Sequence, residues 1–370
     1  MRILFVGESA AGHLAPIVAV FEEINQKKKE LKLNSLEFML ISSKSHFLQE
    51  MLEGVDLPFK TIRAAKSGVA SPLQPILNFL NMIIGFFQSL LFIFDYMPDV
   101  VFSKGGKVSL PIVMVSWIFR IPIIIHESDS VASPVDKFMF KFAKKVAVSF
   151  KDSEEIYQSP KVFFTGNPVR SFIMKADREK AMAEFILNRE KPIILIMGGS
   201  EGAREINNLV IEILPELLEN YQIIHQCGVG NYNDVKSIIE KMNIPNLNNY
   251  HLFPFFKKKI ADAYVVCDLV ISRAGANTVS EILSVDKPSI LIPLASAVSD
   301  KQQKNAFHYS QSGAAVLLSE KNLKPHLILN VVNEIFQSNL KVMEMKRAAR
   351  QLAQPEAARK IAEQVINIAK

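Results

Sequence analysis

The sequence predicts an α/β protein of two doubly wound, Rossmann-like domains that face a central cleft. Its 370 residues exceed the size at which a single hydrophobic core stops growing, so two domains are expected. Short runs rich in Val, Ile and Phe alternate with amphipathic stretches, which is the pattern of parallel strands joined by crossover helices. This alternation stops near residue 166 and restarts near residue 192.

Seven strands are expected in the first domain. Their ranges are 3–7, 37–43, 59–64, 100–106, 122–127, 145–150 and 162–166. A Gly-Asn-Pro sequence at 166–168 then interrupts the pattern, and a charged segment over 175–190 is expected to be helical. We therefore place the first domain at 1–166 and the second at 167–354.

Six strands are expected in the second domain. Their ranges are 192–199, 221–228, 249–256, 269–275, 288–294 and 314–320. The segment 339–370 is helical except at Pro355, which breaks or kinks a helix, and we expect helix 355–370 to pack back on the first domain. Ligands of doubly wound sheets bind beyond the carboxyl ends of the strands, so a substrate is expected between the two domains.

Composition narrows the class of protein. Cys227 and Cys267 lie in apolar runs, which favours buried thiols over a disulfide or a metal site. The N-terminus lacks the apolar stretch of a signal peptide, so the chain is expected to stay in the cytoplasm. The net charge of +6 is modest, and no basic helix interleaved with aromatic residues indicates a nucleic-acid partner. Basic runs at 27–29 and 257–259 favour phosphates or an anionic membrane, or are a solvated surface.

Residues 76–94 form an apolar stretch long enough to span a membrane. A span would separate the first three strands from the next four, which must hydrogen-bond with them in one sheet. The stretch also carries a narrow polar stripe at helical spacing, made by Asn78, Asn81, Gly85 and Gln88.

We therefore expect this segment to be a helix that lies in the membrane interface, with a buried crossover helix as the alternative. Replacing Phe86 and Phe87 with Asp is expected to release the protein from membranes without unfolding it. The residues expected on its broad apolar face are Phe79, Ile83, Phe86, Phe87, Leu90 and Phe94.

Three predicted strands end in turns that suit a sugar nucleotide. The turns read GESAAGH at 7–13, GGSEGA at 198–203 and RAGANTVSE at 273–281. None is a complete GxGxxG, and the chain has no GxxxxGK[ST], so a nicotinamide enzyme or a P-loop ATPase is not expected.

In the second turn, Gly198 and Gly199 allow backbone amides to approach a diphosphate, and Ser200 can donate its hydroxyl at a helix N-terminus. The alternative is a tight turn in which Ser200 caps the helix. In the third turn, the carboxylate of Glu281 can accept both hydroxyls of a ribose, or Glu281 completes a capping box.

A further strand end carries polar side chains that can read neutral sugar hydroxyls. These are Asp300, Gln302 and Asn305, which otherwise form a polar helix start.

Eight motifs taken together resemble the MurG-type enzymes, which transfer N-acetylglucosamine to lipid I in peptidoglycan synthesis. The motifs are AGH at 11–13, GGKVSLP at 105–111, HESD at 126–129, TGNPVR at 165–170, GGSEGA at 198–203, HQCG at 225–228, RAGANTVSE at 273–281 and DKQQKNA at 300–306. The resemblance covers essentially the whole chain and keeps the family's order and spacing.

This resemblance implies a B-type glycosyltransferase fold, with UDP-N-acetylglucosamine held mainly by the C-terminal domain. It implies that the N-terminal domain binds a polyprenyl-diphosphate-linked lipid acceptor and the cytoplasmic face of the cell membrane, as a peripheral protein. Inversion at the anomeric carbon is implied, with no metal and no cofactor. The apolar helix falls where the family carries its membrane patch, and the sequence makes no prediction of the oligomeric state.

Site residues follow from the resemblance by motif. Glu281 is expected to bind the ribose, Ser200 and Arg170 the diphosphate or nearby groups, and Gln302 the donor sugar. A backbone contact near Phe256 is expected for the uracil. Further residues matched to donor-binding positions are Ala10, Ala11, Gly12, Asp129, Gly199, Arg273, Ala276, Asn277, Thr278, Val279, Ser280 and Gln303.

The chain also departs from the family pattern. Glu8, Ser9 and Ala10 replace a glycine-rich loop that usually has a threonine, and Ser9 can supply the missing hydroxyl. Lys107 replaces an aromatic residue and can hold the acceptor diphosphate, and Asp129 replaces an asparagine.

A base must remove the proton of the acceptor hydroxyl. His13 suits this task at neutral pH, because the reference pKa of histidine is about 6.5. The alternative is that His13 orients the diphosphate or sugar. Asp129 and Glu127 are the competing bases. The amides of the glycine turn and Arg170 are expected to stabilise the leaving diphosphate.

Three rival functions stay open at this point. The first is a transferase for another polyprenyl-linked or exopolysaccharide acceptor, which Lys107 and Asp129 permit. The second is a UDP-N-acetylglucosamine epimerase of the same fold, and the third is an inactive membrane scaffold that retains nucleotide binding.

Overall fold

The computed structural model describes residues 1–30, 36–65, 74–199, 202–295 and 300–369. Contacts divide the chain into two compact units: unit 1 is Met1–Arg170 with Gln354–Lys370, and unit 2 is Ser171–Ala353. Each unit holds one parallel sheet whose strand order reverses direction at an inner strand. The predicted class of two doubly wound α/β domains is thereby confirmed.

The sheet of unit 1 has the order β3-β2-β1-β4-β5-β6-β7. Its strands are β1 Arg2–Val6, β2 Glu37–Ser42, β3 Phe59–Thr61, β4 Val100–Ser103, β5 Ile123–Glu127, β6 Lys145–Val148 and β7 Val162–Phe164. All seven expected strands are present, and several end earlier than predicted. β4, for example, stops before Gly105 and Gly106, whose φ angles of 82° and 84° lie outside the β region.

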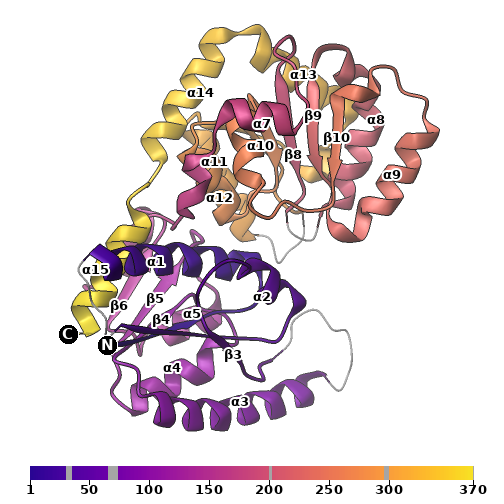
Figure 1. Ribbon diagram of the computed structural model, residues 1–370. Coiled ribbons are helices and arrows are strands. Elements are labelled where there is room, and N and C mark those ends of the chain that lie inside the picture. The colour runs from indigo at the N-terminus through magenta and orange to yellow at the C-terminus, as the bar shows by residue number, and fades with distance from the viewer. Residues whose placement is uncertain (31–35, 66–73, 200–201, 296–299, 370) are drawn as a thin grey trace. The chain divides into compact units, whose positions relative to one another are not determined.

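Helices cover both faces of this sheet (Figure 1). They are α1 Ala11–Glu30, α2 His46–Met51, α3 Gln74–Tyr96, α4 Ser109–Ile118, α5 Pro134–Met139, α6 Asp152–Tyr157 and α15 Ala357–Ala369. Successive strand residues point to opposite faces, so Ile3 and Phe5 pack with α1 and α15, whereas Leu4 and Val6 pack with α3 and α4.

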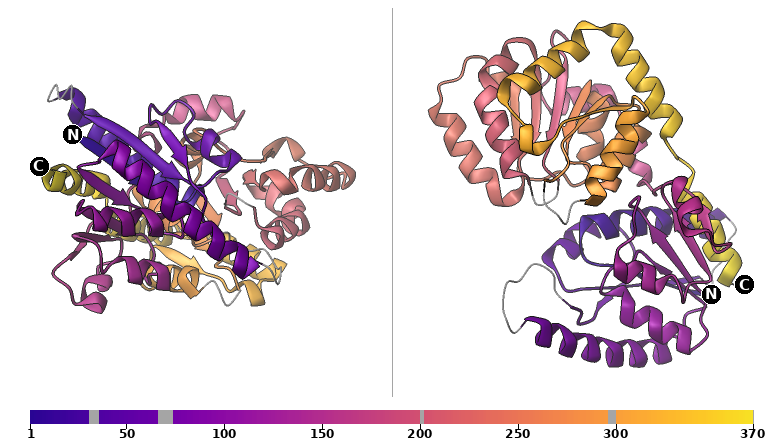
Figure 2. Two further views of the ribbon diagram at one scale, coloured as in Figure 1. Left: turned by 90° about the horizontal axis from the view of Figure 1, so that it is seen from below. Right: turned by 180° about the vertical axis from the view of Figure 1, so that it is seen from behind.

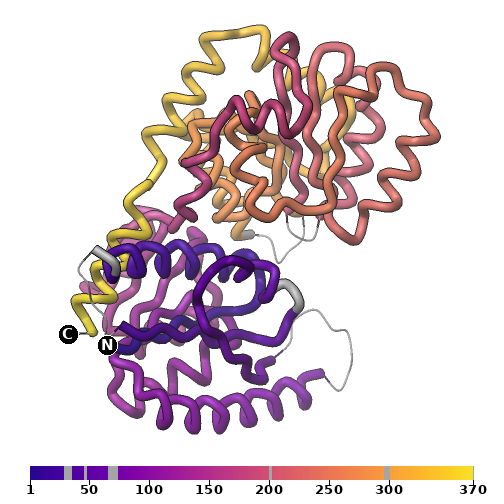
Figure 3. Tube along the Cα trace, viewed as in Figure 1, coloured from indigo at the N-terminus to yellow at the C-terminus, as the bar shows by residue number. Residues whose placement is uncertain are grey.

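The chain returns to unit 1 after leaving unit 2. Helix α14, Asn339–Leu352, ends before Pro355, and α15 then runs beside α1, as the Cα trace in Figure 3 shows. Ile361 and Val365 are buried in the unit 1 core, and Lys27 Nζ pairs with Glu363 at 2.9 Å.

The sheet of unit 2 has the order β10-β9-β8-β11-β12-β13. Its strands are β8 Ile193–Met197, β9 Gln222–Gln226, β10 Tyr250–Phe253, β11 Leu269–Ser272, β12 Ser289–Leu291 and β13 Ala315–Leu317. The remaining helices are α7 Arg178–Glu184, α8 Arg204–Asn220, α9 Tyr232–Lys241, α10 Ile260–Val266, α11 Ala276–Ser284, α12 Asp300–Gln311 and α13 Pro325–Gln337.

Helices of unit 2 also lie on both faces of its sheet (Figure 2). Ile194, Ile196 and Ile223 form its largest apolar core with α8, α9 and α13. The helix expected over 175–190 is shorter than predicted. A 3₁₀ turn over Ser171–Lys175 precedes α7, which begins where the Asp177 side chain accepts a hydrogen bond from the Lys180 amide.

The small and polar stripe of α3 faces the protein. Gly85, Ser89 and Ile93 are its buried residues, and a Cβ on Gly85 would clash with the carbonyl oxygen of Arg63. The Arg63 amide also donates to Gln88 Oε1 at 2.8 Å. The alternative of a buried crossover helix is therefore wrong, because most of the apolar side chains of α3 stay exposed.

Two residues expected on the exposed face of α3 lie elsewhere. Phe86 and Leu90 are half-buried and pack against the unit 1 core, whereas Phe79, Ile83 and Phe87 are exposed as expected. Because Phe86 is partly buried against the core, Phe86→Asp is now expected to destabilise unit 1 as well as to alter the surface, so exposed residues of α3 are better suited to the membrane-release test.

Within the described part of the chain, α3 is the one helix whose length and hydropathy would allow it to cross a membrane. However, β1 precedes α3, β4 follows it, and the two strands pair directly with Ile3 opposite Val100. A membrane span between paired strands is excluded, as the sequence predicted.

Candidate active site

Two of the predicted nucleotide turns meet at one point of the unit 2 sheet. Strand β8 pairs with β9 on one side and with β11 on the other, and Met197 is opposite Ser272 at their carboxyl ends. The connections after β8 and β11 therefore leave toward opposite sides, which forms the crevice where doubly wound sheets bind ligands. The glycine turn and the turn after Ser272 both open at this crevice.

The glycine turn has a backbone that requires glycine. Gly199 adopts a φ of 87°, and a Cβ on Gly198 would clash with the Ala203 backbone nitrogen. The N-cap residue of α8 is Ala203, so the alternative in which Ser200 caps that helix is wrong. Alanine has no side-chain acceptor, which leaves the first-turn amides of α8 suited to an anion. Ser200 itself lies outside the described residues.

Gln226, at the end of β9, connects the glycine turn to the segment expected to bind uracil. Its buried side chain donates from Nε2 to the Gly199 carbonyl oxygen at 3.2 Å and accepts at Oε1 from the Phe256 amide at 2.8 Å. The Phe256 ring packs against Phe185 and Phe253. Because the Phe256 amide already donates to Gln226, the backbone contact expected there for the uracil falls to the Phe256 carbonyl oxygen. Gln226 was not among the predicted site residues, although it belongs to the HQCG motif.

A buried polar network lies behind the glycine turn. The two ring nitrogens of His225 contact Tyr250 Oη at 2.8 Å and Asn207 Oδ1 at 3.1 Å, and Asn207 Nδ2 donates to the Cys227 carbonyl oxygen at 2.9 Å. Burial lowers the pKa of His225 to about 3, so this imidazole is neutral at physiological pH. The HQCG motif thus supports the turn rather than supplying an acid or base.

Both cysteines are free and buried, as predicted. Burial raises the pKa of Cys227 to about 11 and that of Cys267 to about 12, so neither is a reactive thiolate.

Glu281 lies at the crevice inside α11. It is mostly buried, and Tyr264 Oη donates to its Oε2 at 3.2 Å. The N-cap of α11 is Gly275, which places Thr278 rather than Glu281 at the third helical position, so the capping-box alternative is wrong.

The first turn of α11 follows Gly275, an N-cap residue that makes no side-chain hydrogen bond to the helix. Asn277 and Thr278 are partly exposed, whereas Ala276 and Val279 are buried. Ser280 Oγ donates to the Ala276 carbonyl oxygen at 2.8 Å. The Val279 side chain is therefore part of the unit 2 interior, and the Ser280 hydroxyl is engaged by the α11 backbone.

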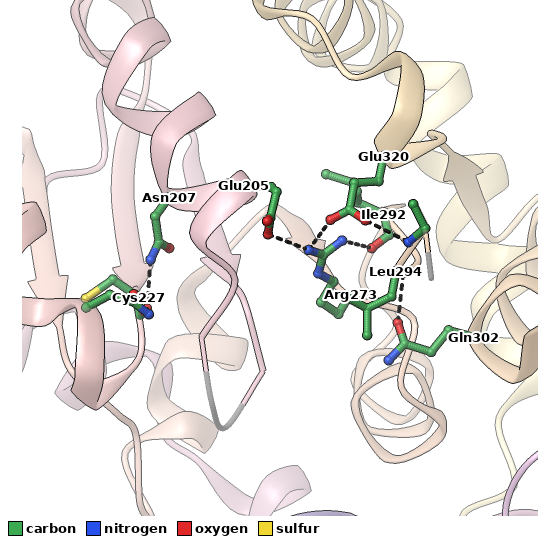
Figure 4. Close-up of polar contacts among 10 residues, drawn as sticks. Glu205, Asn207, Cys227, Arg273, Ile292, Leu294, Gln302 and Glu320 are labelled. Carbon is green, nitrogen blue, oxygen red and sulfur yellow. Dashed lines mark hydrogen bonds and ion pairs between the residues drawn. The ribbon is translucent and has the colours of Figure 1, made fainter. Parts of the chain in front are cut away.

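Arg273 is held by other protein groups (Figure 4). Its guanidinium pairs with Glu320, lies 3.4 Å from Glu205 Oε2, and donates to the Ile292 carbonyl oxygen at 3.2 Å. Only 6% of Arg273 is exposed. A contact between Arg273 and the donor, as predicted, would have to compete with the contacts to Glu320, Glu205 and Ile292.

Gln302, predicted to read the donor sugar, and Gln303, predicted to bind the donor, both contact the backbone of Leu294. Gln302 Oε1 accepts from the Leu294 amide at 3.2 Å, and Gln303 Nε2 donates to the Leu294 carbonyl oxygen at 3.5 Å. Asn305 is completely buried, so it does not reach the surface as a sugar-reading residue must. The side chain of Asp300 lies outside the described residues.

In unit 1, two of the positions that depart from the family pattern, Glu8 and Lys107, contact each other. Glu8 Oε1 accepts from the Lys107 amide at 2.7 Å, which links the loop after β1 to the loop after β4. Ser9 Oγ contacts Ser43 Oγ at 2.8 Å, so the hydroxyl expected to serve the donor is engaged. A Cβ on Gly12 would meet no protein atom within 4 Å, so this position is open to close approach by a ligand.

The three candidate bases lie at the same edge of the unit 1 sheet. His13 is in the first turn of α1, which follows β1, while Glu127 ends β5 and Asp129 follows it. Ala10 and Ala11 stand where the loop enters α1. Glu127 is buried and its Oε1 accepts from the Asp129 amide at 3.0 Å, whereas Asp129 and His13 are partly exposed.

Lys104, which was not among the predicted site residues, is a buried lysine at this edge. Its Nζ donates to Ser128 Oγ at 3.0 Å and to the His126 carbonyl oxygen at 3.4 Å. Burial and the charge of Lys104 hold the pKa of His126 well below its usual value, which excludes His126 as a cation at neutral pH.

Arg170 is the last residue of unit 1, whereas the glycine turn belongs to unit 2. Among the described residues, no three His, Cys, Asp or Glu side chains form a group that could hold a metal ion.

Comparisons with known proteins agree with this arrangement. The model of the glycosyltransferase family 28 N-terminal domain matches residues 3–148, and that of the family 28 C-terminal domain matches residues 193–365. A relative from Bacillus anthracis is 35% identical over 91% of this chain and 92% of its own length. It is named UDP-N-acetylglucosamine--N-acetylmuramyl-(pentapeptide) pyrophosphoryl-undecaprenol N-acetylglucosamine transferase 2.

Solved structures show the same fold. MurG of Acinetobacter baumannii matches with a TM-score of 0.71 at 24% identity, over 99% of both chains. A UDP-GlcNAc 2-epimerase from Neisseria meningitidis, solved with UDP-GlcNAc bound, matches with a TM-score of 0.71 at 14% identity, over 99% of this chain and 100% of that one. The two family models and the Bacillus relative span both units, and the chain therefore belongs to glycosyltransferase family 28, in the MurG-type group that its motifs resemble.

Proposed function

We propose that the chain transfers N-acetylglucosamine from UDP-N-acetylglucosamine to the 4-hydroxyl of the N-acetylmuramic acid of lipid I, which forms lipid II. The observation that carries this proposal is the meeting of the glycine turn and the Glu281 turn at the β8–β11 crevice, in a family 28 chain. The acceptor follows from the printed name of the Bacillus anthracis relative.

Unit 2 is the proposed donor site. The amides of Gly198 and Gly199 with the N-terminus of α8 stabilise the diphosphate, because backbone N–H groups and the helix dipole both favour an anion there. Glu281 accepts the ribose hydroxyls, since a carboxylate offers two acceptor oxygens to a vicinal diol. Tyr264, which donates to Glu281 Oε2, holds this carboxylate in place.

Unit 1 is the proposed acceptor site, and the reaction is a single displacement. The acceptor oxygen bonds to the anomeric carbon, with inversion, as the bond from that carbon to UDP breaks. The hydroxyl proton passes to a base at the unit 1 edge, for which His13, Glu127 and Asp129 are the candidates. The charge that develops on the leaving diphosphate is stabilised by the glycine turn and Arg170, without a metal ion.

Unit 1 is also proposed to bind the cytoplasmic face of the membrane through α3. The exposed apolar residues of α3 form a patch of the kind that monomeric soluble proteins rarely carry. Helix α4 packs beside α3 and carries exposed Trp117 in its last turn, and Phe138 of α5 is exposed as well.

Cations accompany these apolar side chains. Lys60 Nζ lies 5.1 Å from the centre of the Phe92 ring, and Lys141 Nζ lies 5.7 Å from that of Phe138. Such a mixture of apolar and basic side chains suits the interface of an anionic bilayer.

An acceptor panel tests the proposed reaction. Purified protein is given UDP-N-acetylglucosamine with lipid I, with other polyprenyl-diphosphate sugars, or with no acceptor, and UDP release is measured. We expect release with lipid I alone. Release with a different acceptor would favour the exopolysaccharide rival, and no release with any acceptor would favour the inactive scaffold.

A substitution tests the base. If His13 is the base, His13→Ala lowers kcat by about 10²-fold or more. A loss below about tenfold, with normal folding, would exclude His13 and leave Glu127 and Asp129.

A further inference from the structure

Glu320 joins three strand ends of unit 2 through its carboxylate. It begins a 3₁₀ turn, Glu320–Asn322, which follows β13. Its Oε1 pairs with the Arg273 guanidinium at the end of β11, and its Oε2 accepts from the Ala295 amide, beyond β12, at 2.7 Å. A single side chain thus fixes both a cation and a backbone amide that come from two other strands.

The ion pair between Glu320 and Arg273 is shielded from water. The two side chains are 12% and 7% exposed, whereas Glu205, the second carboxylate near Arg273, is 62% exposed. Removing one partner of a buried pair leaves a charge without compensation, but an exposed partner contributes little. Glu320 is therefore the carboxylate on which the position of Arg273 depends.

The segment 292–295 is held at both ends by this pair. Arg273 Nη1 donates to the Ile292 carbonyl oxygen at 3.2 Å, and Glu320 accepts from the Ala295 amide. Between these points lies Leu294, whose amide donates to Gln302 (Figure 4) and whose carbonyl oxygen accepts from Gln303. The ion pair and the two glutamines therefore act on the same short stretch of backbone.

We propose that Glu320 is a positioning residue for recognition of the donor sugar, acting through Arg273 and the 292–295 segment. This inference rests on the proposed function, and on the prediction from the DKQQKNA motif that Gln302 binds the donor sugar and that Gln303 belongs to the donor site. The diphosphate and ribose are assigned to the glycine turn and Glu281, which are supported by Gln226 and Tyr264, and neither of these two residues belongs to the 292–295 segment. Loss of the Glu320 carboxylate therefore weakens binding of UDP-N-acetylglucosamine but leaves binding of UDP intact.

Calorimetry with UDP and with UDP-N-acetylglucosamine measures the two affinities for the wild type and Glu320→Gln. We expect Glu320→Gln to bind the sugar nucleotide about tenfold more weakly, the effect of one or two misplaced hydrogen bonds, with UDP affinity unchanged within about twofold. KM for the donor rises in parallel. Glu334→Gln is the matched control, because it removes an exposed carboxylate of an ion pair in α13, outside the proposed donor site, and it should behave as the wild type.

A second variant addresses folding. If Glu320→Gln unfolds because Arg273 is left buried without a partner, the double variant Arg273→Met with Glu320→Met removes both charges. It still lacks the acceptor for the Ala295 amide, so the same loss specific to the sugar is expected. Glu320→Asp, which keeps the charge, should recover part of the affinity.

The outcomes separate the inference from the proposed function. An unchanged ratio of the two affinities in both variants overturns the inference alone. An equal loss for UDP and the sugar nucleotide also overturns it, because that result means a general structural role. A wild-type protein that binds neither nucleotide overturns the proposed function and this inference together.

Discussion

Replacing four exposed side chains of α3 with serine should detach the protein from membranes. The chosen residues are Phe79, Phe87, Leu91 and Phe94, which are 66%, 58%, 72% and 71% exposed. Complete burial of such a side chain is worth about 1.5–3 kcal/mol, so transferring the exposed two-thirds of each into lipid contributes about 1–2 kcal/mol. The four together contribute about 4–8 kcal/mol, and their loss weakens binding by about 10³-fold or more.

Sedimentation with vesicles that contain anionic lipid measures this loss. The quadruple variant should stay in the supernatant and keep the thermal stability of the wild type, because the changed side chains lie outside the core. Leu340→Ser with Met343→Ser is the matched control, since these residues of α14 are 66% and 67% exposed but belong to unit 2. A quadruple variant that sediments like the wild type would refute the docking role of α3.

Three further predictions concern the donor site and stability. Glu281→Gln should reduce the preference for UDP over 2′-deoxy-UDP by about tenfold or more, because a charge-assisted hydrogen bond to the ribose is lost. Calorimetry measures both affinities, and an unchanged preference would show that Glu281 does not bind the ribose. Gln226→Glu keeps the acceptor for the Phe256 amide but replaces the donor to the Gly199 carbonyl oxygen with an acceptor. UDP should therefore bind about tenfold more weakly, while uridine binds as before. An equal loss of affinity for both ligands would contradict this prediction. Burial lowers the pKa of His225 to about 3 in the folded protein, whereas in the unfolded chain it is about 6.5. Below pH 6.5 the unfolded chain therefore binds an extra proton, and the free energy of unfolding falls by about 2 kcal/mol between pH 7.5 and pH 5. Urea unfolding of His225→Gln should show a pH dependence smaller by this amount, and an identical dependence would show that His225 titrates normally.

The strands and the nucleotide turns were predictable because local sequence determines them. Each strand is an apolar run bounded by glycine or polar residues, and each turn follows a strand. Strand ends were less predictable, since β4 stops where backbone φ angles turn positive, and not where the apolar pattern fades. The orientation of α3 was predicted from its polar stripe, but Phe86 and Leu90 flank that stripe closely enough to pack inward.

The supporting residues of the site were not predictable from motifs. Gln226, Glu320 and Lys104 act through partners that lie far away in sequence and become neighbours only through the strand order. The contacts of Arg273 were not predictable from its motif either. The motif predicts contact with the donor, whereas in the structure the guanidinium contacts Glu320 and the Ile292 carbonyl oxygen, which come from other parts of the sheet.

The most direct test of the proposed function is proton NMR of the reaction between UDP-N-acetylglucosamine and lipid I, with EDTA present. We predict a β-linked N-acetylglucosamine product, with one UDP released for each linkage formed and none in the absence of acceptor. An α-linked product would contradict inversion, and arrest by EDTA would contradict a reaction without metal. Conversion of the donor to its 2-epimer without acceptor would contradict the transferase assignment itself.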